Sequence, residues 1–157
     1  MRVGIGFDAH PFAAGRPLRL GGVEVPHPAG LSGHSDGDVL LHAVADAILG
    51  AAGLGSLGER FPDDSDEWKG ADSSVLLGRA AAAARENGYR VGNVDAVVVA
   101  ESPRLAPHAG RIRARVAEIL GTSGARVSVR GTSSNGLGFP GRGEGIAAVA
   151  VVLLEWV

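Results

Sequence analysis

The sequence predicts a mixed α/β fold of the α+β kind, in which a mixed β-sheet and about three helices form two layers. Long apolar segments that follow helix-capping residues alternate with shorter extended runs, which is typical of this class. Neither a linker nor an internal repeat divides the chain. We therefore expect a single domain over residues 1–157.

The first half of the chain is expected to open the sheet and to supply one buried helix. Residues 3–7 form an extended run, and a hairpin over residues 18–25 is expected to continue the same sheet. Ser35 as N-cap, followed three residues later by an acid, predicts a helix over residues 36–52. The polar, glycine-rich stretch that follows, residues 53–67, is expected to be an irregular loop that covers an active site.

The second half is expected to contain two further helices and the rest of the sheet. The predicted helices begin after Asp72 and at Pro107-His108, and they end near Asn87-Gly88 and Leu120-Gly121. The predicted strands cover residues 94–100, 127–130 and 146–154, with a glycine-rich turn before the last one. Because the last strand is apolar at nearly every position, it needs cover on both faces, and we expect another subunit to supply part of it.

Composition excludes several classes of protein. Of 157 residues, 15 are basic and 17 acidic, a net charge of -2 that does not indicate a nucleic-acid partner. No apolar run reaches the roughly 20 residues that span a bilayer, and polar residues near the N-terminus argue against a secretory signal. We therefore expect a cytoplasmic, bacterial-type protein without a membrane partner. Since cysteine is absent, any metal must be bound by nitrogen and oxygen.

One possible metal site combines two segments that are distant in sequence. Asp38, His42 and Asp46 recur at helical spacing and form a polar stripe on an otherwise apolar helix. Asp8 and His10, two residues apart in extended chain, point to the same side. With His42 they give two imidazoles and a carboxylate, a donor set typical of catalytic zinc with an open fourth position.

Simpler interpretations of these residues remain open. The stripe on the helix could be a solvated face, and Asp8-Ala9-His10 could be a surface turn before Pro11. In the metal hypothesis, Asp46 lies one turn from His42 and is expected to orient its imidazole. His34 and Ser35, beside the start of the helix, would suit an anion.

The segment 130–145 is the second candidate for chemistry. Its glycines match G-x-G-x-x-G, but Pro140 breaks the helix that a dinucleotide site requires, and too few residues follow to supply the acidic partner. What remains is a strand end rich in hydroxyl and backbone N–H groups that could hold phosphate oxygens. A plain glycine turn is the alternative.

Taken together, these motifs resemble the 2-C-methyl-D-erythritol 2,4-cyclodiphosphate synthase family. The resemblance covers nearly the whole chain and rests on motifs at 6–10 (GFDAH), 33–39 (GHSDGDV) with His42, 61–63 (FPD), 92–95 (GNVD), 103–108 and 141–145 (GRGEG). It implies a homotrimer of α/β subunits around a central, sheet-lined cavity, with active sites between neighbours. It also implies conversion of 4-diphosphocytidyl-2-C-methyl-D-erythritol 2-phosphate into the 2,4-cyclodiphosphate and CMP in non-mevalonate isoprenoid biosynthesis.

The resemblance also implies roles for individual residues. Asp8, His10 and His42 would hold Zn²⁺ or another divalent ion, and Mg²⁺ or Mn²⁺ would bind with the substrate diphosphate. The catalytic group would comprise His34 near the phosphates and Thr132 and Ser133 along the phosphate chain. Phe139 and Arg142 would line the central cavity, which can take an isoprenoid diphosphate. The remaining substrate-binding positions would be Ser35, Ser56, Gly58, Asp63, Ala100, Pro103, Arg104, Leu105, Ala106 and Asn135.

Some positions depart from the family pattern. Ser56 stands where an acid commonly binds the ribose, Ser65 replaces a second acid after Asp63, and Asn135 replaces an acid that reaches the magnesium. Because magnesium prefers carboxylate ligands, we expect weaker nucleotide or magnesium binding than is typical. Two alternatives follow: a trimeric homologue that binds zinc and isoprenoid diphosphate with little or no turnover, and a zinc phosphohydrolase that would give a linear product.

Overall fold

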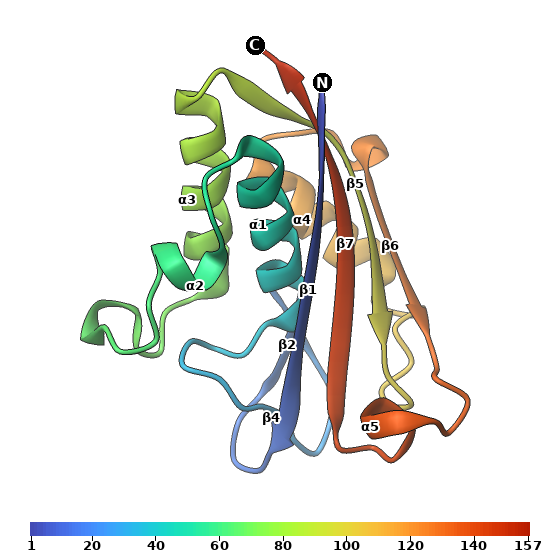
Figure 1. Cartoon of the computed structure of the whole chain (residues 1–157). Coiled ribbons are helices and arrows are strands. Elements are labelled where there is room, and N and C mark those ends of the chain that lie inside the picture. The colour runs from blue at the N-terminus through green and yellow to red at the C-terminus, as the bar shows by residue number, and fades with distance from the viewer.

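A five-stranded mixed sheet forms the body of the protein (Figure 1). The computed structural model describes all residues, 1–157. The strand order is β4-β1-β7-β5-β6, and only β5 and β6 pair in parallel. The strands are β1 (Arg2–Ala13), β4 (Gly30–Leu31), β5 (Tyr89–Val99), β6 (Val127–Thr132) and β7 (Gly145–Trp156).

Three long helices cover one face of this sheet (Figure 1). They are α1 (Val39–Ala52), α3 (Ser73–Glu86) and α4 (Ala109–Leu120), and they confirm the predicted layers. Two of them begin beside residues that the sequence analysis placed at a helix start, since Asp72 is the N-cap of α3 and His108 that of α4. The shorter helical pieces are α2 (Leu57–Arg60), α5 (Gly138–Gly141), η1 (Asp66–Trp68) and η2 (Gly124–Arg126).

Helix α1 lies unusually close to β1 because two glycines face it. A Cβ atom on Gly4 would lie 2.0 Å from the carbonyl oxygen of Ala47, and one on Gly6 would lie 2.0 Å from that of Ala43. No side chain fits in that space, so glycine on the strand and alanine on the helix set the distance between the two elements. The close approach brings His42, just before Ala43, next to the strand.

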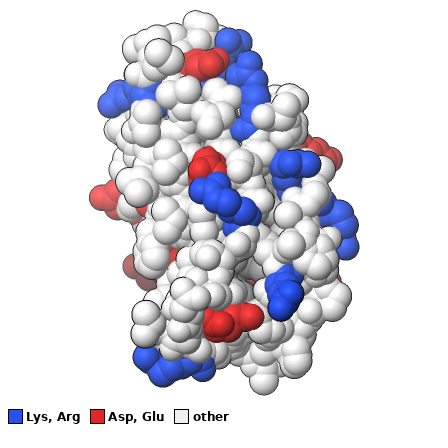
Figure 2. Space-filling view, turned by 90° about the vertical axis from the view of Figure 1, so that its right-hand side faces the viewer, with Lys and Arg blue, Asp and Glu red and all other residues white.

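The opposite face of β1 is apolar and open in the single chain. Val3, Ile5 and Phe7 alternate with the buried glycines and are 69%, 69% and 60% exposed, and Val151 on the paired strand β7 is 40% exposed. The side of the molecule away from α3 is mostly uncharged, with charged side chains in small separate groups (Figure 2). The chain therefore covers only one face of β7 by itself.

The structure corrects three of the local expectations. The hairpin β2 (Leu18–Leu20) and β3 (Val23–Val25) forms its own two-stranded sheet rather than continuing the large one. Helix α1 begins at Val39, because the N-cap is Asp38 rather than Ser35. The segment 53–67 is not wholly irregular, since Ser56 and Glu59 form a capping box that starts α2, and η1 follows it.

No helix of the structure has the length and apolar character needed to cross a membrane.

Candidate active site

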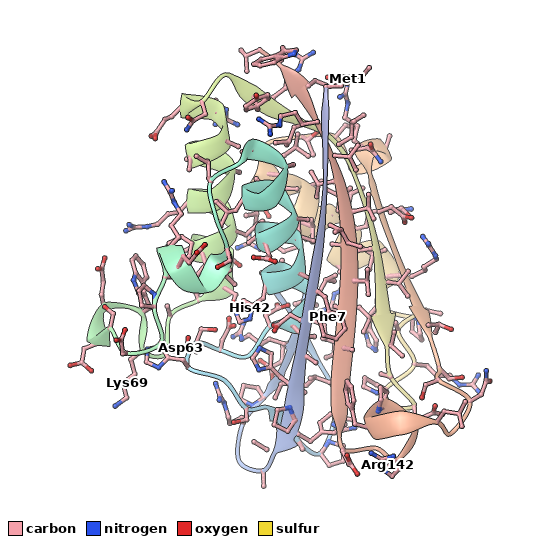
Figure 3. All side chains as sticks on the ribbon, viewed as in Figure 1. Met1, Phe7, His42, Asp63, Lys69 and Arg142 are labelled. Carbon is pink, nitrogen blue, oxygen red and sulfur yellow. The ribbon has the colours of Figure 1, made fainter.

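Asp8 and His10 of β1 meet His42 of α1 in one group. Asp8 Oδ2 lies 2.8 Å from His10 Nε2 and 3.0 Å from His42 Nδ1, and the two imidazole nitrogens are 3.2 Å apart. Residues 8 and 10 share a side of an extended strand, as the sequence predicted, and neither belongs to a turn. His42 lies near the start of α1 beside β1 (Figure 3).

The chemistry and spacing of these donors fit a divalent metal. Two imidazole nitrogens and a carboxylate oxygen lie within 4.8 Å of one another, a group that could hold a metal ion. Zinc–nitrogen and zinc–oxygen bonds near 2.0–2.1 Å in a tetrahedron put neighbouring ligand atoms roughly 3.3 Å apart. The observed separations of 2.8 to 3.2 Å need only a small expansion to reach that geometry.

Charge pairing controls protonation within the group. Burial by itself would raise the pKa of Asp8, but hydrogen bonds and charge from His10 and His42 lower it well below its ordinary value. Burial by itself would lower the pKa of His42, but the hydrogen bond and charge of Asp8 raise it above its ordinary value. Without a metal, this pairing therefore keeps Asp8 ionised and shifts His42 toward its protonated form, and a metal would compete with that proton.

Side chains from two other segments hold the far side of the His42 ring. Its Nε2 lies 2.9 Å from the hydroxyl oxygens of both Ser35 and Ser73. The expectation that Asp46 orients this imidazole is wrong, because the Asp46 carboxylate accepts a hydrogen bond from the backbone N–H of Leu57. Asp38 was also expected to lie on a polar stripe with His42. Its buried carboxylate instead faces the hairpin and accepts hydrogen bonds from the N–H groups of Gly21 and Gly22.

Asp8, His10 and His42 line a cavity of about 500 Å³. Four of the predicted substrate or phosphate residues line it: His34, Ser35, Gly58 and Asp63. Of these, Ser35 is 95% buried, with its hydroxyl toward His42, and Asp63 is exposed at the entrance (Figure 3). Ser56 does not line the cavity but caps α2 beside it.

Sequence reasoning missed two aromatic residues of this cavity. Phe61 and Trp68 both line it and pack edge to face, with ring centroids 5.0 Å apart. The Arg79 guanidinium of α3 lies over the Trp68 ring, 4.8 Å from its centroid. These contacts fasten the segment between α2 and α3 to the rest of the molecule. Phe61 belongs to the 61–63 motif but was given no role in the site, and no pattern in the sequence marks Trp68.

The predicted nucleotide residues gather in a second cavity of about 440 Å³. Its lining contains seven of them: Ala100, Pro103, Arg104, Leu105, Ala106, Thr132 and Ser133. Gly131 makes room there, because a Cβ atom at this position would lie 2.7 Å from the Leu105 side chain. Parallel pairing of Val99 with Thr132 brings the ends of β5 and β6 together. The residues after β5 therefore lie beside Thr132 and Ser133 at the end of β6.

Glu101 organises the turn that follows β6 and was not singled out from the sequence. Its carboxylate accepts hydrogen bonds from the N–H groups of Ser134 and Gly136, on either side of Asn135, at 3.1 and 3.3 Å. Asn135 has a φ of 54°, a left-handed conformation that asparagine tolerates better than most residues. Glu101, which also lines the second cavity, therefore connects the turn to that cavity, although position 135 itself has no carboxylate.

Phe139 and Arg142 lie apart from both cavities. Phe139 is half-buried in the short helix α5, and Arg142 is the residue that caps its C-terminal end (Figure 3). The Arg142 guanidinium pairs with Glu144 at 2.7 Å. The predicted glycine turn is therefore partly helical.

Within one chain the two cavities are separate. Strand pairing places Asp8, Ala148, Val98 and Gly131 in one row across β1, β7, β5 and β6. Three strand spacings separate Asp8 from Gly131, roughly 14 Å. The buried Ala148 and Val98 lie between them, and no residue lines both cavities.

Comparison with known proteins assigns the chain to a family. The model of the YgbB family matches residues 1–155. The 2-C-methyl-D-erythritol 2,4-cyclodiphosphate synthase of Marinobacter nauticus is 54% identical over 157 residues, covering 100% of this chain and 99% of that protein. The enzyme of the same name from Alkalilimnicola ehrlichii is 56% identical over 155 residues, covering 98% and 94%.

The chain belongs to the 2-C-methyl-D-erythritol 2,4-cyclodiphosphate synthase family. It is thus an enzyme, a phosphorus–oxygen lyase of isoprenoid biosynthesis. These relatives carry the name of the enzyme, so the alternative of a homologue without turnover gains no support from them.

Solved structures agree with this assignment. A CDP-bound 2C-methyl-D-erythritol-2,4-cyclodiphosphate synthase superposes with a TM-score of 0.90 at 36% identity, covering 98% of this chain and 100% of that one. The bifunctional IspDF of Campylobacter jejuni gives a TM-score of 0.96 at 43% identity. The match covers 99% of this chain but only 42% of the bifunctional chain.

Proposed function

We propose that the chain is an active cyclodiphosphate synthase that converts 4-diphosphocytidyl-2-C-methyl-D-erythritol 2-phosphate into 2-C-methyl-D-erythritol 2,4-cyclodiphosphate and CMP. The observation that carries the proposal is the Asp8, His10 and His42 group at the base of an open cavity. A second cavity with the predicted nucleotide residues, and family members of the same name, support it.

The proposed reaction needs no nucleophile from the protein. An oxygen of the 2-phosphate forms a bond to the nearer phosphorus of the diphosphate, and the bond from that phosphorus to the oxygen shared with CMP breaks. The electron pair of the broken bond leaves with CMP, so the reaction consumes no water. The work of the protein is to position the two phosphates and to neutralise their charge.

The side chains of Asp8, His10 and His42 are proposed to bind Zn²⁺. Bound there, the ion would supply a Lewis acid for a phosphate oxygen through its fourth position. His34 and Ser35 line the same cavity and would hold phosphate beside it, while Asp63 at the entrance would accept hydrogen bonds from the methylerythritol hydroxyls.

The second cavity is proposed to hold the cytidine diphosphate part of the substrate. Its segment 103–106 and Ala100 would contact the cytosine largely through backbone groups, and the Thr132 and Ser133 hydroxyls would bind the phosphate chain. The synthase that superposes with a TM-score of 0.90 is described with bound CDP, which supports a cytidine nucleotide here. Mg²⁺ or Mn²⁺ would accompany the diphosphate, with the neutral Asn135 as a weaker partner than a carboxylate.

Assembly as a homotrimer is proposed to bring the two cavities together. The apolar face of β1 and β7 is open in the single chain, and burying it against other copies would remove Val3, Ile5 and Phe7 from water. The metal group of one subunit would then face the nucleotide cavity of its neighbour. Phe139 and Arg142 are proposed to line the central cavity of the assembly, where an isoprenoid diphosphate could bind.

The experiment is to measure CMP release from the cytidine-linked substrate with and without Zn²⁺ and Mg²⁺. We expect release that requires both metals and is lost in His42→Ala, because alanine removes a metal ligand. A matched control is His108→Ala, which changes a half-buried histidine that makes no side-chain hydrogen bond as the N-cap of α4. Absence of CMP from the wild-type protein at saturating metal would overturn the proposal.

A further inference from the structure

A chain of hydrogen bonds runs from Asp36 through Ser73 to the ring of His42. The Ser73 hydroxyl contacts Asp36 Oδ1, and His42 Nε2 lies 2.9 Å from the Ser73 oxygen. Ser73 is fully buried at the start of α3, and Asp36 lies in the loop before α1. Residues from two segments, the loop before α1 and the start of α3, therefore converge behind the imidazole, on the side away from Asp8.

The directions of these hydrogen bonds follow from the donors available. Asp36 also accepts from two backbone N–H groups, those of Asp38 and Ser73, both at 3.1 Å, so its carboxylate serves as acceptor throughout. A hydroxyl has one proton, and Ser73 gives its proton to Asp36. The Ser73 oxygen can then only accept from His42, which places a proton on His42 Nε2.

We infer that Asp36 and Ser73 are positioning residues that hold His42 with its proton on Nε2 and its Nδ1 lone pair directed between Asp8 and His10. Ser35 completes the arrangement, since its buried oxygen is 2.9 Å from the same Nε2 and 3.3 Å from the Ser73 oxygen. Hydrogen-bond partners of metal-ligating histidines fix the ring nitrogen that binds and commonly change metal affinity by about 10- to 100-fold.

This inference rests on the proposed metal site and goes beyond it. The experiment measures the zinc dissociation constant of the full chain by competition with a chromophoric chelator. Failure of the wild-type protein to bind zinc would overturn the metal site and the positioning role together. Normal wild-type binding with no effect of the variants would overturn the positioning role alone.

Asp36→Asn is the main variant, because an amide cannot accept all three hydrogen bonds and can donate to the Ser73 oxygen. That donation would free the Ser73 proton for His42 Nε2 and move the ring proton to Nδ1. We expect the zinc dissociation constant to rise about 10- to 100-fold. Asp72→Asn is the matched control: it makes the same charge change at the N-cap of α3, where Asp72 accepts from the Ser74 N–H, and it should bind zinc like the wild type.

A second pair of variants keeps the test decisive if Asp36→Asn does not fold. Ser73→Ala removes the acceptor and should weaken zinc binding, while Ser73→Thr keeps a hydroxyl and should restore most of it. In ¹⁵N-histidine NMR of the zinc-loaded protein, His42 should have its proton on Nε2, and that proton should exchange with solvent faster in Ser73→Ala. A proton on Nδ1 in the wild type, or equal zinc loss in Asp72→Asn and Asp36→Asn, would overturn the inference.

Discussion

At the scale of residues, the site is built around His42, which is contacted on both ring nitrogens. Nδ1 faces Asp8 and His10, and Nε2 faces the buried hydroxyls of Ser35 and Ser73. No buried polar side-chain atom of the protein lacks a hydrogen-bond partner. A histidine held this way does not need to reorganise to bind a metal, and that saves the free energy of ordering the ligand.

As the pH is lowered, zinc affinity should begin to fall at a higher pH than in a site with an ordinary histidine. Asp8 raises the pKa of His42 above its usual 6.5, so protons compete with the metal for Nδ1 already above that pH. The pKa of Asp8 is lowered, so its carboxylate stays ionised and adds no dependence in this range. Chelator competition from about pH 8 to about pH 5.5 should show a loss approaching about tenfold per pH unit. A constant affinity over that range would contradict this pairing.

Asn135→Glu should carry a cost in stability. The φ of 54° suits asparagine but strains a glutamate, so we expect a loss of about 1 kcal/mol in the free energy of unfolding. Asn135→Gly, which relieves that strain, is the control and should be close to neutral. Urea unfolding measures the free energy of unfolding of both variants. Equal stability of Asn135→Glu and the wild type would show that the turn accepts a glutamate without strain. A gain in CMP release by the glutamate variant, despite this cost, would identify position 135 as a magnesium contact.

The three metal-binding candidates were predictable from the sequence, but the contacts of Ser35 and Ser73 with the His42 ring were not. Asp8, His10 and His42 could be combined because their spacings put them on one side of a strand and on a helix. Ser73 gave no such signal, since it was visible only as part of a helix cap. Asp46 was assigned by helical spacing alone, but hydrogen bonding to the Leu57 backbone took precedence.

At the scale of elements, the contact between β1 and α1 decides whether the site forms. Gly4 and Gly6 leave room for the Ala47 and Ala43 backbone, which holds the helix against the strand that carries Asp8 and His10. Two of the 25 glycines of the chain therefore have a structural reason that spacing alone did not show.

Gly6→Ala should push α1 away from β1. The added carbon would lie 2.0 Å from the Ala43 carbonyl oxygen, so we expect a loss of about 3 kcal/mol or more in the free energy of unfolding, together with weaker zinc binding. Gly50→Ala is the matched control: this exposed glycine of α1 has open space around its Cβ position and should stabilise the protein by about 0.5–1 kcal/mol. Thermal and urea unfolding measure both. Equal effects of the two substitutions would contradict the role of the close contact.

Long helices were predictable because their caps and apolar periodicity are local signals. The predicted starts at Asp72 and His108 agree with the observed N-caps, whereas the start of α1 was misplaced. Ser35 and Asp38 both fit a cap, and the choice depended on a contact distant in sequence: Asp38 also accepts hydrogen bonds from the hairpin. The separate sheet of that hairpin had no local signal either.

At the scale of the whole molecule, the proposed trimer explains two features. These are the open apolar face of the sheet and the separation of the two cavities within one chain. A single chain leaves Phe7 60% exposed and keeps the metal group away from the nucleotide residues. Assembly would remove the apolar surface from water and complete the site in one step.

Ile5→Asp should therefore dissociate the assembly and abolish activity together. Ile5 is 69% exposed at the centre of the open face, and a buried aspartate without a partner would strongly disfavour association. Val75→Asp on α3, at a position that is 49% exposed on the helical side, is the control and should leave the molecular mass unchanged. Light scattering after size-exclusion chromatography gives the mass. A trimer for Ile5→Asp, or a monomer for the wild type, would refute this assembly.

The proposed function requires that the chain cyclises its substrate rather than hydrolysing it, and ³¹P NMR of the product distinguishes the two reactions. With Zn²⁺, Mg²⁺ and the cytidine-linked substrate, we expect CMP and a product whose two phosphorus atoms are coupled to each other in a cyclic diphosphate. A linear product that retains a free phosphate monoester would identify a zinc phosphohydrolase and rule out the synthase.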